Sequence, residues 1–248
     1  MTTPGSPDVT RHPKTMHTGK FLIAYNPLFR VIATWAWWFV GAALTVLVIL
    51  AIRGVPLAAA SEALSGERTY LALYIEIVSV GLLPLVFTLI CRDEPARYGL
   101  ARRGWMKSLI LSLLFTASVF AVGYVMTGRW MTDSRPTIHP DFPWNLWYGL
   151  LGILAWGPLE VFFFIWLIVN TEGIFKNRTI ADFLGLLITV FLFTLIHILT
   201  TDIRNALYTG AIFLIMGLIF KSTRNAIGPM IAWTLINGQV WYMARLLF

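Results

Sequence analysis

Long apolar runs separated by short polar segments fill the chain after Arg30. A helix needs about 20 mostly apolar residues to cross a bilayer, because it rises about 1.5 Å per residue through a hydrocarbon layer about 30 Å thick. Most of the runs have about this length, and the sixth is shorter than the others. They predict membrane helices over residues 31–52, 70–91, 106–126, 146–169, 180–199, 206–220 and 226–247.

This pattern predicts an all-α, polytopic transmembrane helix bundle of about seven spans. Residues 30–248 are expected to form the bundle as one domain, because no soluble linker or convincing internal repeat divides them. Residues 1–29 begin with a polar, proline-containing stretch and are expected to form a disordered cytoplasmic tail.

Composition supports a membrane location. Hydrophobic residues make up 58% of the chain and charged residues 12%, whereas soluble domains are about 45–50% apolar and about 25% charged. We therefore expect a multi-pass integral membrane protein, in contact with membrane lipid and located in the cell membrane.

The positive charge of the chain indicates its orientation. The formal net charge is +7, and lysine and arginine are commoner in the segments that would face the cytoplasm if the N-terminus were inside. Cytoplasmic loops of membrane proteins carry this bias, so we expect the N-terminus inside. The basic residues are scattered over short loops, which argues against a nucleic-acid surface.

Three polar residues lie where a membrane helix should be apolar. Glu160 is in the fourth run, His197 in the fifth and Asn237 in the seventh. A charge at the centre of a span costs at least about 2.5–3.5 kcal/mol, so it usually has a use. Each could also be structural alone, for example an asparagine that joins two helices.

The expected depths of these residues agree. Counting about 1.5 Å per residue places Glu160 and Asn237 near mid-membrane and His197 about one turn closer to the outside. Glu76, in the second run, could join them or lie above them. Pro158 predicts a kink, and backbone groups freed by a kink must face protein or a water-filled cavity. A wet pocket beside Glu160 is therefore expected.

No metal or cofactor is expected. One glutamate, one histidine and one asparagine are an incomplete set of ligands for catalytic zinc, which usually takes three from His, Glu and Cys. The single cysteine, Cys91, excludes an internal disulfide bond and a multi-cysteine metal site.

These motifs resemble the CPBP superfamily of membrane proteases, which includes the type II CAAX prenyl endopeptidases and the Abi-like proteins. That family has a Glu-Glu-x-x-x-Arg motif, then Phe-x-x-x-His, then His-x-x-x-Asn, on successive helices. Glu160 matches the first glutamate, Phe193 and His197 match the second motif, and Asn237 matches the end of the third. The resemblance covers roughly residues 95–245.

The chain departs from the family pattern at three positions. Val161 stands in place of the second glutamate, Ile165 in place of the arginine, and Trp233 in place of the third-motif histidine. An indole N–H can donate a hydrogen bond but cannot accept one. Trp233 could therefore replace histidine in part, if the role needs only a donor.

The resemblance implies a divergent intramembrane endopeptidase. Glu160 and His197 would activate a water molecule, and Asn237, with Trp233, would donate to the developing oxyanion. The substrate would be a prenylated or membrane-embedded peptide. The three departures leave open a non-catalytic protein of the same fold that binds a peptide, a lipid or a partner helix. A transporter or proton pathway through Glu76, Glu160 and His197 is a third alternative, against which the absence of inverted repeats argues.

Overall fold

The protein is a bundle of long apolar helices. The computed structural model describes residues 23–64, 66–133, 136, 138–175 and 177–248. Within these residues, six helical segments are long and apolar enough to cross a membrane, and a shorter apolar helix follows them. The predicted all-α, multi-pass bundle is therefore confirmed. The six segments are Pro27–Arg53, Arg68–Ile90, Trp105–Thr127, Trp144–Glu172, Phe183–Thr200 and Ile203–Thr223.

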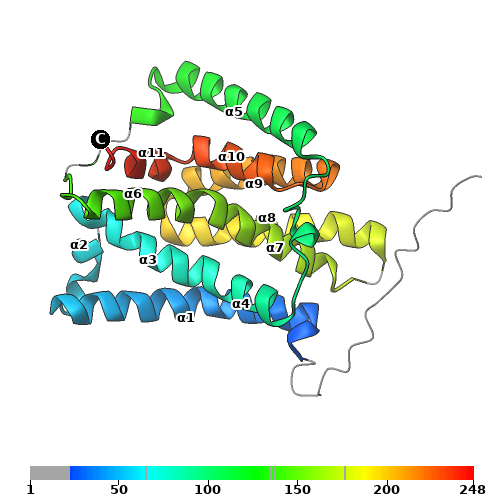
Figure 1. Ribbon diagram of the computed structural model, residues 1–248, viewed down its shortest axis with the longest axis horizontal. Helices are drawn as coiled ribbons and strands as arrows, with labels where there is room; N and C mark the ends of the chain where they lie inside the picture. The colour runs from blue at the N-terminus through cyan, green and yellow to red at the C-terminus, as the bar shows by residue number, and fades with distance from the viewer. Residues whose placement is uncertain (1–22, 65, 134–135, 137, 176) are drawn as a thin grey trace, which may run out of the picture.

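Two of these segments are interrupted by π-helices, whereas the other four lie in continuous α-helices. Figure 1 shows how these helices are arranged. The continuous helices are α1 (Pro27–Arg53), α5 (Trp105–Thr127), α8 (Arg178–Thr200) and α9 (Ile203–Thr223). The second segment consists of the end of η3 (Gly66–Leu71), α3 (Ala72–Glu76), the π-helix η4 (Ile77–Leu82) and α4 (Leu83–Ile90). The fourth consists of α6 (Trp144–Leu154), the π-helix η7 (Ala155–Leu159) and α7 (Glu160–Glu172). Short helical turns occupy the connections: η2 (Leu57–Ala59), α2 (Ala60–Leu64), η5 (Pro95–Tyr98) and η6 (Met131–Asp133).

The seventh apolar run is not one helix. It forms α10 (Ile227–Ile236) and α11 (Gly238–Ala244), and Asn237 between them has an extended backbone with φ −69° and ψ 118°. The side chain of Asn237 accepts a hydrogen bond from the backbone N–H of Gln239 at 2.9 Å and so caps α11. Hydropathy alone did not reveal this break, because apolar residues occur on both sides of Asn237.

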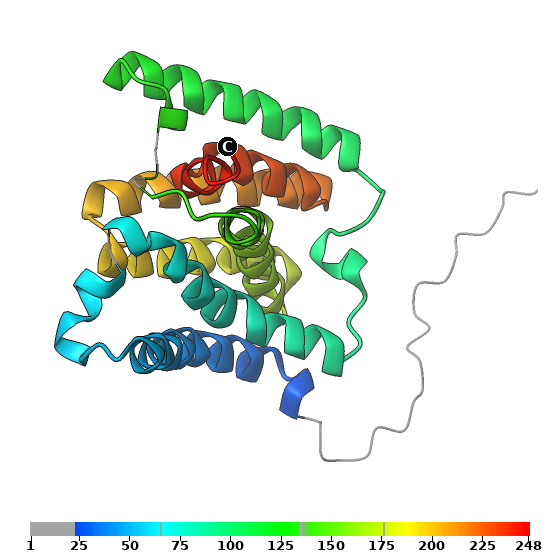
Figure 2. The ribbon, with the colours of Figure 1, turned by 60° about the vertical axis from the view of Figure 1, so that its left-hand side comes forward.

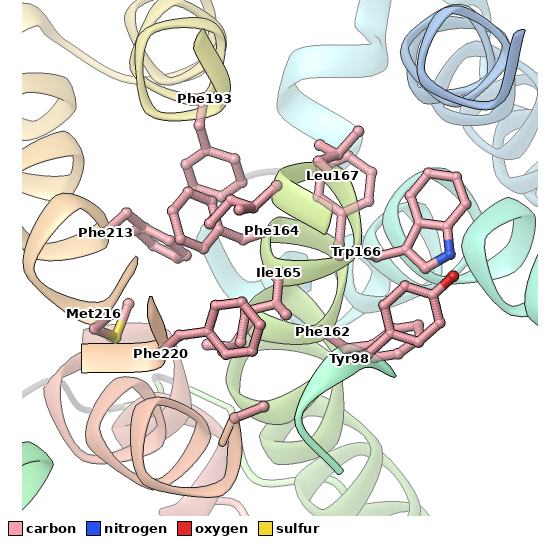
Figure 3. Close-up of a cluster of buried hydrophobic side chains, with 14 of the residues drawn as sticks. Tyr98, Phe162, Phe164, Ile165, Trp166, Leu167, Phe193, Phe213, Met216 and Phe220 are labelled. Carbon is pink, nitrogen blue, oxygen red and sulfur yellow. The ribbon is translucent and has the colours of Figure 1, made fainter. Parts of the chain in front are cut away.

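Helix α7 lies at the centre of the bundle. From Val161 to Ile168 every side chain is buried, which is typical of a helix that is apolar all round and is surrounded by other helices. Aromatic residues from several elements pack around it: Phe193 of α8 and Phe213 of α9 on one side, and Tyr98 beside Trp166 on another (Figure 3).

Helix α5 lies at the edge of the bundle, on the opposite side from α1 (Figures 1 and 2). Its buried residues are Ser108, Ser112 and Thr116, which recur every fourth position and so form one face. This face packs against α10, where an added Cβ at Gly228 would collide with Ser108. Small residues of this kind allow membrane helices to approach closely.

A buried ion pair joins α1 to the loop after α4. Arg30 is 2% exposed, and its guanidinium donates to Asp93 at 2.8 Å and to Asn170 of α7 at 3.2 Å. Tyr98 also donates to Asp93, at 2.6 Å. Burial and then the hydrogen bond to Asp93 raise the pKa of Tyr98 to about 12. These contacts fix the start of α1 against the central helix at one end of the bundle.

The first described residues lead directly into the bundle. Helix α1 begins at Pro27, and the side chain of Asn26 caps it by accepting from the N–H groups of Leu28 and Phe29. The bundle thus begins slightly before residue 30. The predicted tail lies mostly in residues 1–22, outside the described residues, and it stays a prediction.

Candidate functional site

Glu160 is the first residue of α7, directly after the π-helix η7. Pro158 lies inside η7 and has no N–H to donate, and the N–H of Glu160 bonds to the carbonyl of Gly157 rather than to that of Trp156, four residues back. The sequence predicts a kink at Pro158, and the structure has a π-helix there. It places a carboxylate that is 5% exposed deep inside the bundle.

One oxygen of Glu160 is held by two donors from the broken seventh run. The indole N–H of Trp233 donates to Oε2 at 2.6 Å, and the amide of Asn237 donates to the same oxygen at 3.4 Å. Trp233 and Asn237 are four residues apart, so they project from the same side of this segment. The indole at the position where the resemblance places a histidine is thus a donor to Glu160.

Asn237 also binds the backbone of η7. Its Nδ2 donates to the carbonyl of Trp156 at 2.8 Å. Asn237 therefore does three things: it ends α10, caps α11, and ties this junction to the π-helix that precedes Glu160. The extended backbone of Asn237 separates α10 from α11, while its own N–H still bonds to the carbonyl of Trp233.

His197 faces the other oxygen of Glu160. Its Nε2 lies 3.8 Å from Oε1 of Glu160, and its Nδ1 lies 2.9 Å from the carbonyl oxygen of Phe193. A carbonyl can only accept, so Nδ1 carries the hydrogen and Nε2 of the neutral ring is an acceptor. The 3.8 Å separation is too long for a direct hydrogen bond.

A cavity of about 500 Å³ lies beside this cluster. Glu160, His197, Trp233 and Asn237 all line it, so the structure brings together the four residues that the sequence singled out, and the predicted pocket beside Glu160 is present. Glu76 of α3 lines the same cavity. The sequence allowed Glu76 either to join these residues or to lie above them, and the structure places it in the same cavity. The remaining wall is mainly aromatic and aliphatic, with hydroxyl and amide side chains where α8 ends and α9 begins.

The other two departures from the family motif lie away from the cavity. Val161 is 0% exposed and Ile165 is 1% exposed, and both pack in the hydrophobic core. A glutamate and an arginine in these places would need each other, because either charge alone would be buried without a partner. Their joint replacement by apolar residues leaves a continuous apolar core around α7.

The described residues contain no group of three or more His, Cys, Asp or Glu arranged to hold a metal ion. Sequence reasoning missed the bond from Trp233 to Glu160 and left the position of Glu76 open. The four-residue spacing of Trp233 and Asn237 was a usable signal for their shared side. No sequence signal fixed the distance between Glu76 and the fourth segment, because that distance depends on how separate helices pack.

The fold and the cluster define a multi-pass helical membrane protein in which Glu160, His197, Trp233 and Asn237 meet at one cavity. Residues 142–239 match the family model described as Type II CAAX prenyl endopeptidase Rce1-like. The family resemblance is therefore confirmed for this segment, which carries an Rce1-like domain and contains the four residues of the cluster. The match is shorter than the 95–245 expected from the motifs, and it excludes Glu76. Comparisons with curated proteins and with solved structures gave no match.

Proposed function

We propose that the protein is a divergent intramembrane endopeptidase in which Glu160 and His197 activate water for hydrolysis of a peptide bond. The observation that carries this proposal is the arrangement around Glu160. Its Oε2 is held by Trp233, while its Oε1 faces the acceptor Nε2 of His197 at 3.8 Å. A water molecule about 2.8 Å from both atoms would donate a hydrogen bond to each, and one of its two free lone pairs would face a substrate carbonyl in the cavity.

The proposed reaction uses these groups in sequence. Glu160, assisted by His197, accepts a proton as the water oxygen bonds to the carbonyl carbon. The carbonyl π electrons move onto oxygen and form an oxyanion. When the oxyanion re-forms the carbonyl, the C–N bond breaks and the accepted proton passes to the leaving nitrogen. The products are a carboxylic acid and an amine, and no oxidant or metal takes part.

Asn237, with Trp233, is the proposed oxyanion donor pair. In this structure the indole N–H donates to Glu160, and the amide donates to Trp156 and Glu160. As Glu160 takes up a proton its charge decreases, and it becomes a weaker acceptor than the oxyanion formed beside it. The weaker of its two contacts, the 3.4 Å contact with Asn237, is the one we expect to be exchanged first. Removal of one oxyanion donor typically lowers kcat about 10²–10³-fold.

The proposed substrate is a prenylated or membrane-embedded peptide, because the site lies within the apolar bundle. The test is cleavage of such peptides by protein reconstituted in liposomes. We expect Glu160→Gln to abolish cleavage, since the amide is nearly isosteric but cannot accept the proton. Glu94→Gln is the matched control, because Glu94 is exposed in the loop before η5. Equal cleavage by the Glu160→Gln protein would overturn the proposal.

A non-catalytic role in binding is the second candidate. The bond from Trp233 to Glu160 favours it, because it satisfies the buried carboxylate without a substrate. In this case the cavity would bind a peptide, lipid or partner helix and release it unchanged. A stable partner recovered equally with wild-type and Glu160→Gln protein, without cleavage, would support this role. Cleavage that Glu160→Gln abolishes would exclude it.

A further inference from the structure

Glu76 is a second carboxylate in the cavity, and the proposed hydrolysis does not use it. It is the last residue of α3, directly before the π-helix η4, and it lines the same cavity as Glu160. Its side chain makes no hydrogen bond or ion pair with any other described residue, whereas Glu160 has two donors. A carboxylate in such a place normally has a partner, because an unpaired charge inside a membrane protein is costly.

The packing of two π-helices holds the two carboxylates in one cavity. Helix η4 follows Glu76 and η7 precedes Glu160, and these two elements are in contact. Gly81 of η4 allows this approach, since an added Cβ there would lie 2.7 Å from a methyl carbon of Leu159 in η7. Two ionised carboxylates that share a cavity repel each other, and a cation between them replaces this repulsion with two attractions.

The charge of the cavity wall has one sign. Glu76 and Glu160 line the cavity, and the described residues around it include no lysine or arginine. The contrast with the whole chain is large, since the formal net charge of the protein is +7. A cation that enters this cavity therefore meets acidic groups without a competing basic side chain.

The aromatic lining of the cavity favours an organic cation over a metal ion. Trp38, Trp156, Phe163, Phe193, Tyr208 and Trp233 contribute to the wall. The faces of aromatic rings attract ammonium groups, and the attraction is strongest where water is excluded. A metal ion would instead need several oxygen, nitrogen or sulfur ligands at short distance. Among the described residues, no group of three or more His, Cys, Asp or Glu side chains is arranged to hold one.

We propose that the cavity is a binding site for an organic ammonium group, held between the carboxylates of Glu76 and Glu160 and enclosed by aromatic side chains. The ammonium belongs to a small amphiphilic amine or to a lysine side chain of a peptide. The volume of about 500 Å³ accommodates either group together with part of the apolar chain that carries it. This site does not depend on peptide hydrolysis and is tested without it.

The test measures how ligands shift the thermal unfolding midpoint of the detergent-solubilised protein at constant ionic strength. A ligand that binds only the folded state raises this midpoint with concentration, from which Kd follows. Choline is the small ammonium probe and 3,3-dimethylbutan-1-ol is its neutral isostere. A lysine-containing pentapeptide amide is the peptide probe, and the same peptide with norleucine is its neutral counterpart. We expect the ammonium member of at least one pair to bind at least tenfold more tightly than its neutral counterpart.

The variants locate the site. Glu76→Gln is expected to weaken ammonium binding at least fivefold, whereas Glu94→Gln, outside the cavity, should leave it unchanged. If choline binds more tightly than its neutral isostere and this preference requires Glu76, the ligand is a small amine. If only the lysine peptide shows such a preference over its norleucine counterpart, the ligand is a peptide. Equal binding of charged and neutral members in both pairs, or equal binding by wild-type and Glu76→Gln protein, would overturn the proposal. Neither result depends on whether the protein cleaves peptides.

Discussion

The indole N–H of Trp233 donates to the Glu160 carboxylate at 2.6 Å, inside the bundle and between helices α10 and α7. This bond fixes one carboxylate oxygen and leaves the other facing His197. Trp233 stands where the family motif has histidine, so the substitution exchanges one N–H donor for another. Glu160 therefore has an indole donor although the motif itself is changed.

Replacement of Trp233 tests this bond. Trp233→Phe keeps an aromatic ring but removes the donor, and hydrogen bonds to charged groups contribute about 1.5–3 kcal/mol. We expect the free energy of unfolding to fall by about this amount and peptide cleavage to decrease. Trp233→His, which can still donate, should retain more of both. The measurements are unfolding in detergent and cleavage in liposomes, and equal behaviour of the two variants would contradict the assigned donor role.

Asn237 combines a structural and a chemical role, and two substitutions separate them. Asn237→Ala removes the cap of α11, which costs about 0.5–2 kcal/mol, together with the donor to Trp156 and Glu160. Asn237→Asp keeps an acceptor for the N–H of Gln239 but loses the amide donor. If the amide is needed for catalysis, both variants lose cleavage. Circular dichroism should show that α11 is retained better in Asn237→Asp, and full activity of this variant would exclude the oxyanion role.

The buried Arg30–Asp93 pair is expected to matter more for stability than the exposed pair at the same carboxylate. Arg30→Met leaves a buried carboxylate without its closest basic partner, and breaking a buried pair costs about 3–5 kcal/mol. Arg97 is 41% exposed and lies 3.4 Å from Asp93, so Arg97→Met should cost at most about 1 kcal/mol. Thermal or denaturant unfolding of the two variants measures this difference, and similar losses would show that burial of Arg30 contributes little.

Restoration of the family motif one residue at a time should fail. Val161→Glu introduces a carboxylate at a position that is 0% exposed, and we expect it to destabilise the protein by about 3–5 kcal/mol. Ile165→Arg lies one turn further along α7 and can pair with it. The double variant should therefore be more stable than the sum of the single changes predicts, by about 0.5–3 kcal/mol. Strict additivity in the double-mutant cycle would show that the two charges do not meet.

Tyr98 should make stability depend on pH at alkaline values. Burial and the bond to Asp93 raise the pKa of Tyr98 to about 12 from an ordinary 10, so the folded state favours the neutral phenol. This contribution is fully present below pH 10 and is lost as the pH rises from 10 to 12. The total is about 2–3 kcal/mol, since one pKa unit corresponds to about 1.4 kcal/mol. Tyr98→Phe should remove this part of the decline, and identical alkaline unfolding of both proteins would contradict it.

The sequence by itself determined the membrane class and most of the helices, and it singled out four residues that line one cavity in the structure. Apolar runs of about 20 residues form helices in lipid. The bilayer core contains no water to bind the backbone N–H and C=O groups, and a helix pairs these groups within the run itself. Polar residues such as Glu160 and His197 stand out against these runs without any structural information. Even so, the apolar run around Asn237 concealed a broken helix, because hydropathy does not record backbone conformation.

Only the tertiary structure decided what these residues contact. The bond from Trp233 to Glu160, the 3.8 Å gap to His197 and the entry of Glu76 into the same cavity all join residues from different helices. Such distances depend on which helices are neighbours, and on their rotation and axial position. Close packing sets these through local fits such as that of Gly81 against Leu159. The pattern of apolar and polar residues fixes which parts of the chain enter the membrane, but it does not fix these fits.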